Sequence, residues 1–208
     1  MSIKILIAHQ SAIPHYRVDF FNHLQDDLNN KYQFDVVFDN SAQKNYFTEP
    51  IQYKKFRFNI LKTKTYSIKF FNKNITFQNF IFSLRKYDII IIEDAINNIS
   101  YPICHLLKLF YKYKIYKWGH GCDRGVENPK YLKIMMEMFK LYLIKRSDGY
   151  LAYTKGVKDF LINENINSNK IFIINNTIDI NKNHSFIHDQ DIDKYKNQLN
   201  INKQNILL

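Results

Sequence analysis

The chain has 208 residues, of which 46% are hydrophobic and 16% aromatic, so it can bury a substantial core and has room for one domain and a smaller second one. Its formal net charge of +11 favours anionic partners such as phosphates, acidic lipids or nucleic acid. No apolar run approaches the roughly 18 residues of a membrane-spanning helix, and the short amino-terminal run lacks the cleavage site of a signal peptide, so the sequence predicts a cytoplasmic protein.

The first part of the chain alternates between strand-like and helix-like patterns. Residues 3–9 are nearly all apolar, as in a strand buried on both faces. In 15–28 the apolar side chains recur at helical spacing, which indicates an amphipathic helix. Residues 32–38 predict a second strand, the partial alternation of 52–61 favours a third, and 75–86 is expected to be a helix.

The middle of the chain contains the clearest strand, 87–94, in which a run of isoleucines is followed by two acids. Residues 100–113 predict a helix with Ser100 as its N-cap. Residues 114–118 then predict a strand, and 128–147 predict a long helix.

The last part of the chain changes character after its final predicted strand. Residues 148–154 predict a strand, 155–166 a helix and 170–179 another strand. Residues 181–193 are polar and acidic and predict a linker. A short helix is expected over 192–201, before the apolar end "NILL", where a new buried strand would begin.

The alternation of strand and helix predicts an α/β fold: a Rossmann-like doubly wound parallel sheet with helices on both faces. We expect this domain to span residues 1–180. Residues 181–208 are expected to contain the linker and the start of a truncated second domain.

The turn Gly119-His120-Gly121 is the most specific local feature. The chain has only 5 glycines, and glycine permits positive φ and close approach of a ligand to the backbone. Ligands of open parallel sheets bind beyond the carboxyl ends of the strands, where this turn lies. An incidental exposed histidine in a tight turn is an equally favoured interpretation on local grounds. No loop carries a dinucleotide-binding or P-loop glycine pattern, which disfavours those two classes of site.

A metal site is disfavoured by ligand number. The pairs Cys104-His105 and His120/Cys122 lie on different elements, whereas zinc sites need three or four ligands at recognisable spacings. The two cysteines fit a reducing compartment. We therefore expect no metal and no bound cofactor.

Two basic regions leave a binding function open. Residues 50–87 contain no acidic residue, and the helix at 130–146 combines Met, Leu, Tyr and Phe with lysines. A solvated lysine-rich surface and a core helix with snorkelling lysines are the simpler interpretations. Contact with an acidic membrane surface or with single-stranded nucleic acid is the alternative. Nucleic acid is the disfavoured partner, because lysine and aromatic residues are abundant throughout the chain.

Four segments resemble, in order and spacing, motifs of the retaining GT-B glycosyltransferases of family four, also called group 1. They are "IPHYRVDFFNHL" (13–24), "KWGHG" (117–121), "SDGYLAYTKGVKDFL" (147–161) and "KIFIINNTID" (170–179). The resemblance covers about residues 1–180. It implies a two-domain enzyme that transfers a sugar from a nucleotide donor, with the first domain binding mainly the acceptor and the second most of the donor.

The resemblance also implies roles for individual residues. His120 matches the family's histidine near the donor sugar and leaving phosphate, where an imidazole can donate a hydrogen bond to the growing negative charge. Arg17 is expected to clamp a phosphate, and Glu93 and Asp94 are expected to bind acceptor hydroxyls. The remaining residues expected along the substrate and donor cleft are His15, Tyr16, Gly119, Gly121, Tyr153, Asn176 and Asp179. Of these, Asn176 and Asp179 match the family's hinge Asn and Asp and are expected to order the loop and not to take part in the chemistry.

The chain departs from the family in two places. The loop "HQSAIPHYR" after the first strand contains no glycine, and the donor half with its E-x7-E carboxylates is absent. We expect a truncated glycosyltransferase of bacterial surface-polysaccharide assembly (lipopolysaccharide, capsule or exopolysaccharide) that uses a nucleotide sugar and a glycan or lipid-linked acceptor, peripheral on the inner face of the cytoplasmic membrane. The 208-residue chain itself is expected to be inactive or nearly so. The alternative is a non-catalytic basic binding module.

Overall fold

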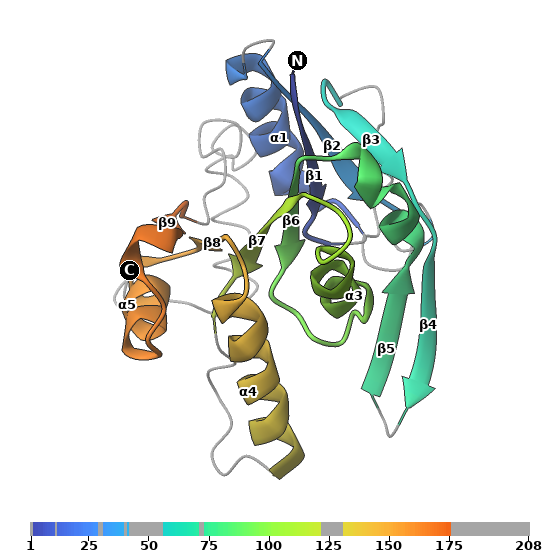
Figure 1. Cartoon of the computed structure of the whole chain (residues 1–208). Coiled ribbons are helices and arrows are strands. Elements are labelled where there is room, and N and C mark those ends of the chain that lie inside the picture. Colours follow the sequence, from blue (N-terminus) through green and yellow to red (C-terminus); the bar gives the residue numbers. More distant parts are fainter. Residues whose placement is uncertain are drawn as a thin grey trace, which may run out of the picture. The chain divides into compact units, whose positions relative to one another are not determined.

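The computed structural model describes residues 2–10, 12–28, 31–39, 41, 56–70, 73–121 and 131–175 (Figure 1). The chain divides into two compact units, Met1–Asn176 and Thr177–Leu208, and all of the described residues belong to the first unit. The expected boundary at residue 180 and the expected linker and second domain in 181–208 stay predictions, because these residues lie outside the described ones.

Seven parallel strands form the central sheet, in the order β3-β2-β1-β6-β7-β8-β9. The strands are β1 (Ile3–Ala8), β2 (Tyr32–Phe38), β3 (Asn59–Lys62), β6 (Ile89–Glu93), β7 (Lys114–Gly119), β8 (Gly149–Ala152) and β9 (Ile171–Ile173). The chain first builds outward from β1 through β2 to β3, and then returns to the other side of β1 with β6. The direction of growth therefore reverses between β1 and β6, which is the place where doubly wound sheets bind ligands.

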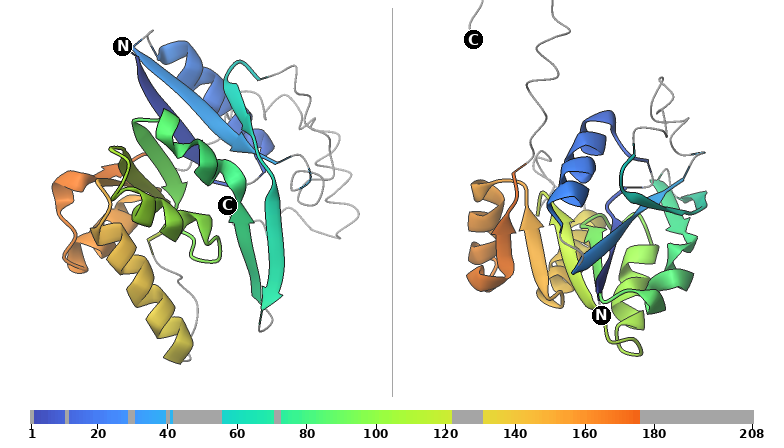
Figure 2. Two further views of the ribbon diagram at one scale, coloured as in Figure 1. Left: turned by 45° about the vertical axis from the view of Figure 1, so that its right-hand side comes forward. Right: turned by 90° about the horizontal axis from the view of Figure 1, so that it is seen from above.

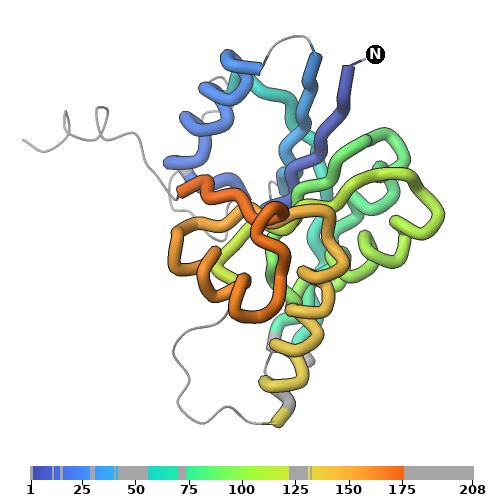
Figure 3. The backbone as a smooth tube through the Cα atoms, turned by 60° about the vertical axis from the view of Figure 1, so that its left-hand side comes forward, coloured from blue at the N-terminus to red at the C-terminus, as the bar shows by residue number. Residues whose placement is uncertain are grey.

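Helices cover both faces of this sheet, which confirms the predicted fold class (Figures 2 and 3). They are α1 (His15–Asp27), α3 (Ser100–Leu107), α4 (Tyr131–Lys145) and α5 (Lys155–Asn163), with the 3-10 helices η2 (Asn79–Lys86) and η3 (Ser168–Lys170).

The strand period of two explains the two-sided core. Ile7 of β1 packs in the same cluster as Val18 and Phe21 of α1. Its neighbour Leu6 points to the other face and packs in the cluster that contains Cys104 of α3. A third cluster, on the α3 face beside β8, joins α4 and α5 to the sheet; it contains Ile144, Tyr150, Ala152, Val157 and Leu161.

The predicted helix at 75–86 is wrong over its first residues. β5 (Lys73–Gln78) pairs antiparallel with β4 (Thr65–Phe70) in a two-stranded sheet of its own, and only η2 after it is helical. The stretch Ile75-Thr76-Phe77 is rich in strand-forming side chains, and its apolar spacing fits either period. Pairing with a distant strand decides the structure here, and the sequence pattern of the segment alone cannot show that pairing.

The structure also differs from the sequence prediction at the start of one helix and of one strand. Ser100 is the first residue of α3 and not its N-cap: its hydroxyl accepts the N–H of Gln78 at 2.7 Å and contacts the carbonyl oxygen of Gln78 at 3.0 Å. The expected strand at 52–61 is strand only from Asn59, and 51–55 lie outside the described residues. Among the described helices, none has the length and apolar character needed to cross a membrane.

Candidate functional site

The residues that follow β1, β6, β7 and β8 gather at the end of the sheet where these strands have their carboxyl ends. These four strands are neighbours and run parallel, so their carboxyl ends lie side by side. His9 follows β1, Asp94 follows β6, His120 follows β7 and Tyr153 follows β8. This end includes the β1/β6 reversal point, where a ligand site is expected in this class of fold.

Five residues at this end form a cluster of rings and basic groups, which we call the aromatic–basic cluster: His9, Arg17, Trp118, His120 and Tyr153. Arg17 donates from Nη2 to the Tyr153 hydroxyl at 2.9 Å, and its guanidinium lies 4.7 Å from the centre of the Trp118 ring. The rings of His120 and Tyr153 are 4.4 Å apart, and those of His9 and Trp118 are 4.3 Å apart. His120 is exposed, whereas Arg17 is 4% exposed. The histidine is therefore the solvent-facing member of a largely buried cluster.

The protonation states inside the cluster follow from its hydrogen bonds. Burial, with the charge of Arg17 and His120 added, lowers the pKa of His9 to about 3, so its imidazole is neutral. The Tyr153 hydroxyl lies 2.6 Å from His9 Nε2 and already accepts from Arg17, so its own proton is donated to this nitrogen. Burial raises the pKa of Tyr153 to about 12, which keeps that proton in place.

A second group lies beneath the His120 turn, which we call the buried ionic cluster: Glu93, Asp94, Lys117, Lys140 and Tyr150. Asp94 Oδ2 accepts the backbone N–H of Gly121 at 2.8 Å and the Tyr150 hydroxyl, and Lys140 Nζ of α4 lies 3.6 Å from the same oxygen. The Tyr150 oxygen also accepts the Gly121 N–H, at 2.7 Å. Asp94 is only 6% exposed, so these contacts are made out of solvent.

The two glycines of the turn are required by this arrangement. A Cβ on Gly119 would lie 2.1 Å from Asp94 Oδ1, so no larger residue fits over the carboxylate. Gly121 has a φ of 76°, a backbone conformation that favours glycine. The glycine spacing seen in the sequence therefore reflects a backbone that wraps around Asp94 and holds His120 at the surface.

Glu93 and Lys117 have opposite pKa displacements in the same buried region. Burial, and next the Asp94 charge, raise the pKa of Glu93 to about 7. Burial lowers the pKa of Lys117 to about 8, although Asp94 opposes this shift. Lys117 is 1% exposed, and its Nζ donates to the Glu93 carbonyl oxygen at 3.4 Å. Perturbed groups of this kind concentrate at functional sites and also occur in purely structural ion networks.

The structure brings together most of the residues expected at the site. Arg17, Glu93, Asp94, His120 and Tyr153 join the two clusters, with Gly119 and Gly121 forming the turn; Tyr16, 42% exposed, lies with its ring centre 5.5 Å from the Arg17 guanidinium. His15 begins α1, and its side chain is not described. Asn176 and Asp179 lie outside the described residues.

The other members of the clusters are not among the site residues expected from the sequence: His9, Lys117, Trp118, Lys140 and Tyr150. His9 does begin the loop after the first predicted strand, where a ligand site is expected. A lysine in the middle of the apolar strand "KIYKW" was a usable signal for Lys117. Lys140, interpreted as a snorkelling lysine, is instead 8% exposed and points to Asp94. Nothing in the sequence of α4 shows that this lysine meets a carboxylate far earlier in the chain.

Metal-ligand geometry is not found where the structure can be described. No group of three or more His, Cys, Asp or Glu side chains within the described ranges could hold a metal ion. Burial raises the pKa of Cys104 to about 12, so this thiol is a poor source of a thiolate ligand. Cys122 lies outside the described residues. The expectation that no cofactor is bound stays a prediction.

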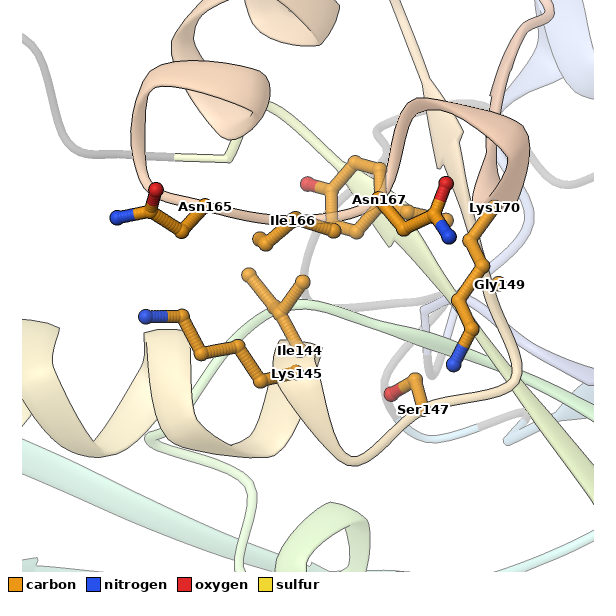
Figure 4. A pocket seen from close by; sticks show the side chains of 9 residues that line it. Ile144, Lys145, Ser147, Gly149, Asn165, Ile166, Asn167 and Lys170 are labelled. Atoms are coloured by element: carbon orange, nitrogen blue, oxygen red, sulfur yellow. The ribbon is translucent and has the colours of Figure 1, made fainter.

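A cavity of about 260 Å³ lies at the opposite end of the sheet, where the strands begin, between the ends of α4 and α5 and the start of β8 (Figure 4). It is lined by Ile144, Lys145, Ser147, Gly149, Tyr150, Asn165, Ile166, Asn167 and Lys170. A much smaller cavity of about 10 Å³ lies beside His9 and Arg17. Pockets for small ligands usually enclose several hundred Å³, so the cavity beside His9 and Arg17 is too small by itself to enclose a nucleotide.

No protein-family model matches the chain, and no curated protein matches it significantly. Among solved structures, the chain is similar to HepE from Anabaena in complex with UDP and glucose, with a TM-score of 0.54 and 11% identity over 96% of this chain and 50% of that one. It is also similar to UDP-GlcNAc 2-epimerase from Neisseria meningitidis bound to UDP-GlcNAc, with a TM-score of 0.50 and 14% identity over 83% of this chain and 46% of that one. At these identities the likeness shows the fold, and the chain spans about half the length of either structure.

Proposed function

We propose that this domain is the acceptor-side half of a glycosyltransferase that uses a nucleotide sugar. The observation that carries the proposal is the aromatic–basic cluster at the carboxyl edge of β1, β7 and β8, with exposed His120 on a glycine turn at its surface. Support comes from the four sequence motifs and from a fold shared with proteins solved with UDP or a UDP-sugar. The finer proposal is a retaining enzyme of family four that transfers a hexose to a glycan or lipid-linked acceptor in bacterial surface-polysaccharide assembly.

His120 has the position to act on a leaving phosphate. Its imidazole is exposed, so it is able to donate a hydrogen bond to negative charge that develops on a nucleotide leaving group. Arg17 is 4% exposed and bonded to Tyr153, so its charge acts on the site from behind that ring and does not clamp a phosphate directly in this conformation. We thus propose that His120 contacts the leaving phosphate directly and that Arg17 and Tyr153 position His120.

Nucleotide binding tests the proposal on the chain as it exists. Addition of excess UDP to the isotope-labelled protein is expected to cause weak shifts of the amide signals of Gly119, His120 and Gly121, because the family resemblance assigns most of the donor affinity to the second domain. The substitution His120→Ala should weaken this response, whereas His23→Ala, at an exposed histidine of α1, should leave it unchanged. Equal responses of the two variants, or shifts confined to other parts of the chain, would remove His120 from the proposed site.

Epimerisation of a nucleotide sugar is the second candidate reaction, because the same fold occurs in a UDP-GlcNAc 2-epimerase. Because the 208-residue chain is expected to be inactive by itself, a protein that joins this domain to a donor-binding second domain is incubated with UDP-GlcNAc to separate the two. An epimerase converts the sugar nucleotide without an acceptor, whereas a transferase releases UDP only when an acceptor receives the sugar. Conversion without an acceptor would reject the transferase proposal.

We also propose that α4 rests on an acidic membrane surface at the cytoplasmic side. Large apolar residues on this helix are exposed, among them Tyr131 at 78%, Met138 at 66% and Tyr142 at 51%, and Lys145 and Arg146 follow at its end. Apolar and basic groups together bind acidic lipid surfaces. Binding to vesicles that contain phosphatidylglycerol, absent with purely zwitterionic vesicles and weakened by Met138→Glu, is the expected result. Salt-sensitive binding to single-stranded DNA without any vesicle binding would favour the nucleic-acid alternative.

A further inference from the structure

We propose that the free edge of β4 binds an acidic, extended segment of a partner protein by strand addition. β4 and β5 form a hairpin outside the seven-stranded sheet, and β4 is the outer of the two strands (Figure 1). β5 is tied to the domain on its other side, where Thr76 bridges to Asn98. Among the described residues, β4 has a strand partner on one side only, and an unpaired strand edge is a template for another extended chain.

The hydrogen bonds of Thr76 identify which backbone groups face the free edge. Its N–H donates to Asn97 and its carbonyl oxygen accepts from Ile99, so both groups point away from β4. Thr76 lies opposite Ser67, and paired residues of antiparallel strands alternate between bonded and non-bonded positions. Ser67, and with it Lys69 two positions on, therefore present their N–H and carbonyl groups on the outer edge of β4.

These outward groups are available to a ligand. Neither Ser67 nor Lys69 has a backbone hydrogen bond at that edge within the part of the chain that the structure describes, and both residues are exposed. Two residues before Ser67, the outward N–H is already bonded within the domain, because the N–H of Thr65 donates to the Asp39 carboxylate at 2.5 Å. The open stretch thus begins after Thr65 and offers two donors and two acceptors.

The side chains along this edge define what an added strand should carry. Tyr66 and Ile68 are 54% and 71% exposed on one face of the hairpin, opposite Phe77 and Ile75. Ser67 and Lys69 project from the other face, because successive side chains of a strand alternate. A partner strand with apolar residues at every second position would cover Tyr66 and Ile68, and its intervening residues would lie beside Lys69.

Charge selects an acidic partner in preference to a second copy of this chain. Between residues 56 and 87 the chain has no Asp or Glu, and its basic residues there are Arg57, Lys62, Lys64, Lys69, Lys73, Arg85 and Lys86. Of these residues Lys69 lies on β4 itself. Pairing of two β4 edges would bring two copies of this basic segment together without a compensating acid from 56–87, and edge lysines deter such self-pairing. Glutamate or aspartate at the intervening positions of another strand would be attracted instead.

The test uses the full chain and a capped seven-residue peptide of alternating glutamate and valine. Saturable shifts of the Ser67 and Lys69 amide signals, weakened by added salt, are expected. A peptide with lysine in place of glutamate should not bind. A glutamate peptide N-methylated at alternate residues should bind at least about fivefold more weakly, because it lacks the donors for the Ser67 and Lys69 carbonyl oxygens.

Two variants separate backbone pairing from simple charge attraction. Ser67→Pro removes one outward donor at a position where an edge strand tolerates proline, and should weaken binding by about fivefold or more. Ser67→Ala keeps the backbone and should bind as the original chain does. Equal affinities of these two variants, or equal affinities of the methylated and unmethylated peptides, would overturn strand addition. Self-association of the chain that Ser67→Pro abolishes would overturn the acidic partner in favour of a second copy.

Discussion

The carboxylate of Asp94 accepts a hydrogen bond from the backbone N–H of Gly121 at 2.8 Å, and this contact ties the end of β6 to the turn that carries His120. The same oxygen accepts from Tyr150 of β8 and faces Lys140 of α4. One side chain thus joins three elements and the turn beneath the proposed site.

Replacement of Asp94 should therefore be costly. Asp94→Ala leaves the Gly121 N–H, the Tyr150 hydroxyl and the Lys140 charge without this partner in a buried place, and about 3 kcal/mol of unfolding free energy should be lost. Asp94→Asn keeps an acceptor and should lose less. Urea unfolding measures both, with Asp159→Ala, at an exposed position of α5, as the control, expected within about 0.5 kcal/mol. A loss for Asp94→Ala no larger than that of the control would contradict the role given to this carboxylate.

Gly119 and Asp94 should be energetically coupled. Gly119→Ala places a Cβ only 2.1 Å from Asp94 Oδ1, which is far inside van der Waals contact. The substitution should lower the free energy of unfolding by at least about 2 kcal/mol. In the Asp94→Ala background the three nearest atoms are gone, so the same glycine substitution should cost clearly less. A double-mutant cycle by urea unfolding should give a coupling above about 1 kcal/mol, and additive losses would show that the turn does not wrap around the carboxylate.

Glu93 should make stability depend on pH. The pKa of its carboxyl is about 7 in the folded state against an ordinary 4.5, so between these values the folded state holds more protons than the unfolded chain. The stabilisation from this group is fully present below pH 4.5, is lost progressively as the pH rises from 4.5, and is gone once the pH has passed about 7. Relative to Glu93→Gln, the original chain should lose up to about 1.4 kcal/mol per pH unit between pH 4.5 and 7. Urea unfolding of both proteins at several pH values checks this, and a constant difference would refute it.

The Tyr153 hydroxyl should matter for both stability and binding. It accepts from Arg17 at 2.9 Å and lies 2.6 Å from His9 Nε2, so Tyr153→Phe should lose about 1–2 kcal/mol of unfolding free energy. The same change should weaken UDP binding, because Arg17 and the ring beside His120 lose their common anchor. Tyr116→Phe, whose ring packs near Phe172, is the matched control and should change neither. A loss of stability with unaltered UDP binding would separate this hydroxyl from the proposed site.

Much of the fold was predictable because its signals are local. The apolar runs of β1, β2 and β6 and the helical spacing of α1 record which side chains are buried, and burial sets the period of each element. The β4–β5 hairpin was missed because Ile75, Thr76 and Phe77 fit a strand or a helix, and only pairing with residues 65–70 decides between them.

The fold class and the position of the His120 turn can be inferred from the amino-acid sequence, since alternating periods and rare glycines are visible along the chain. The side chains that support that turn become apparent only in the folded domain. Tyr150 and Asp94 are 56 positions apart, and Arg17 and Tyr153 are 136 apart, yet each pair is hydrogen bonded. These residues come into contact because the strand order places β1, β6, β7 and β8 side by side in the sheet. No local pattern encodes that order, because it results from the packing of the whole sheet.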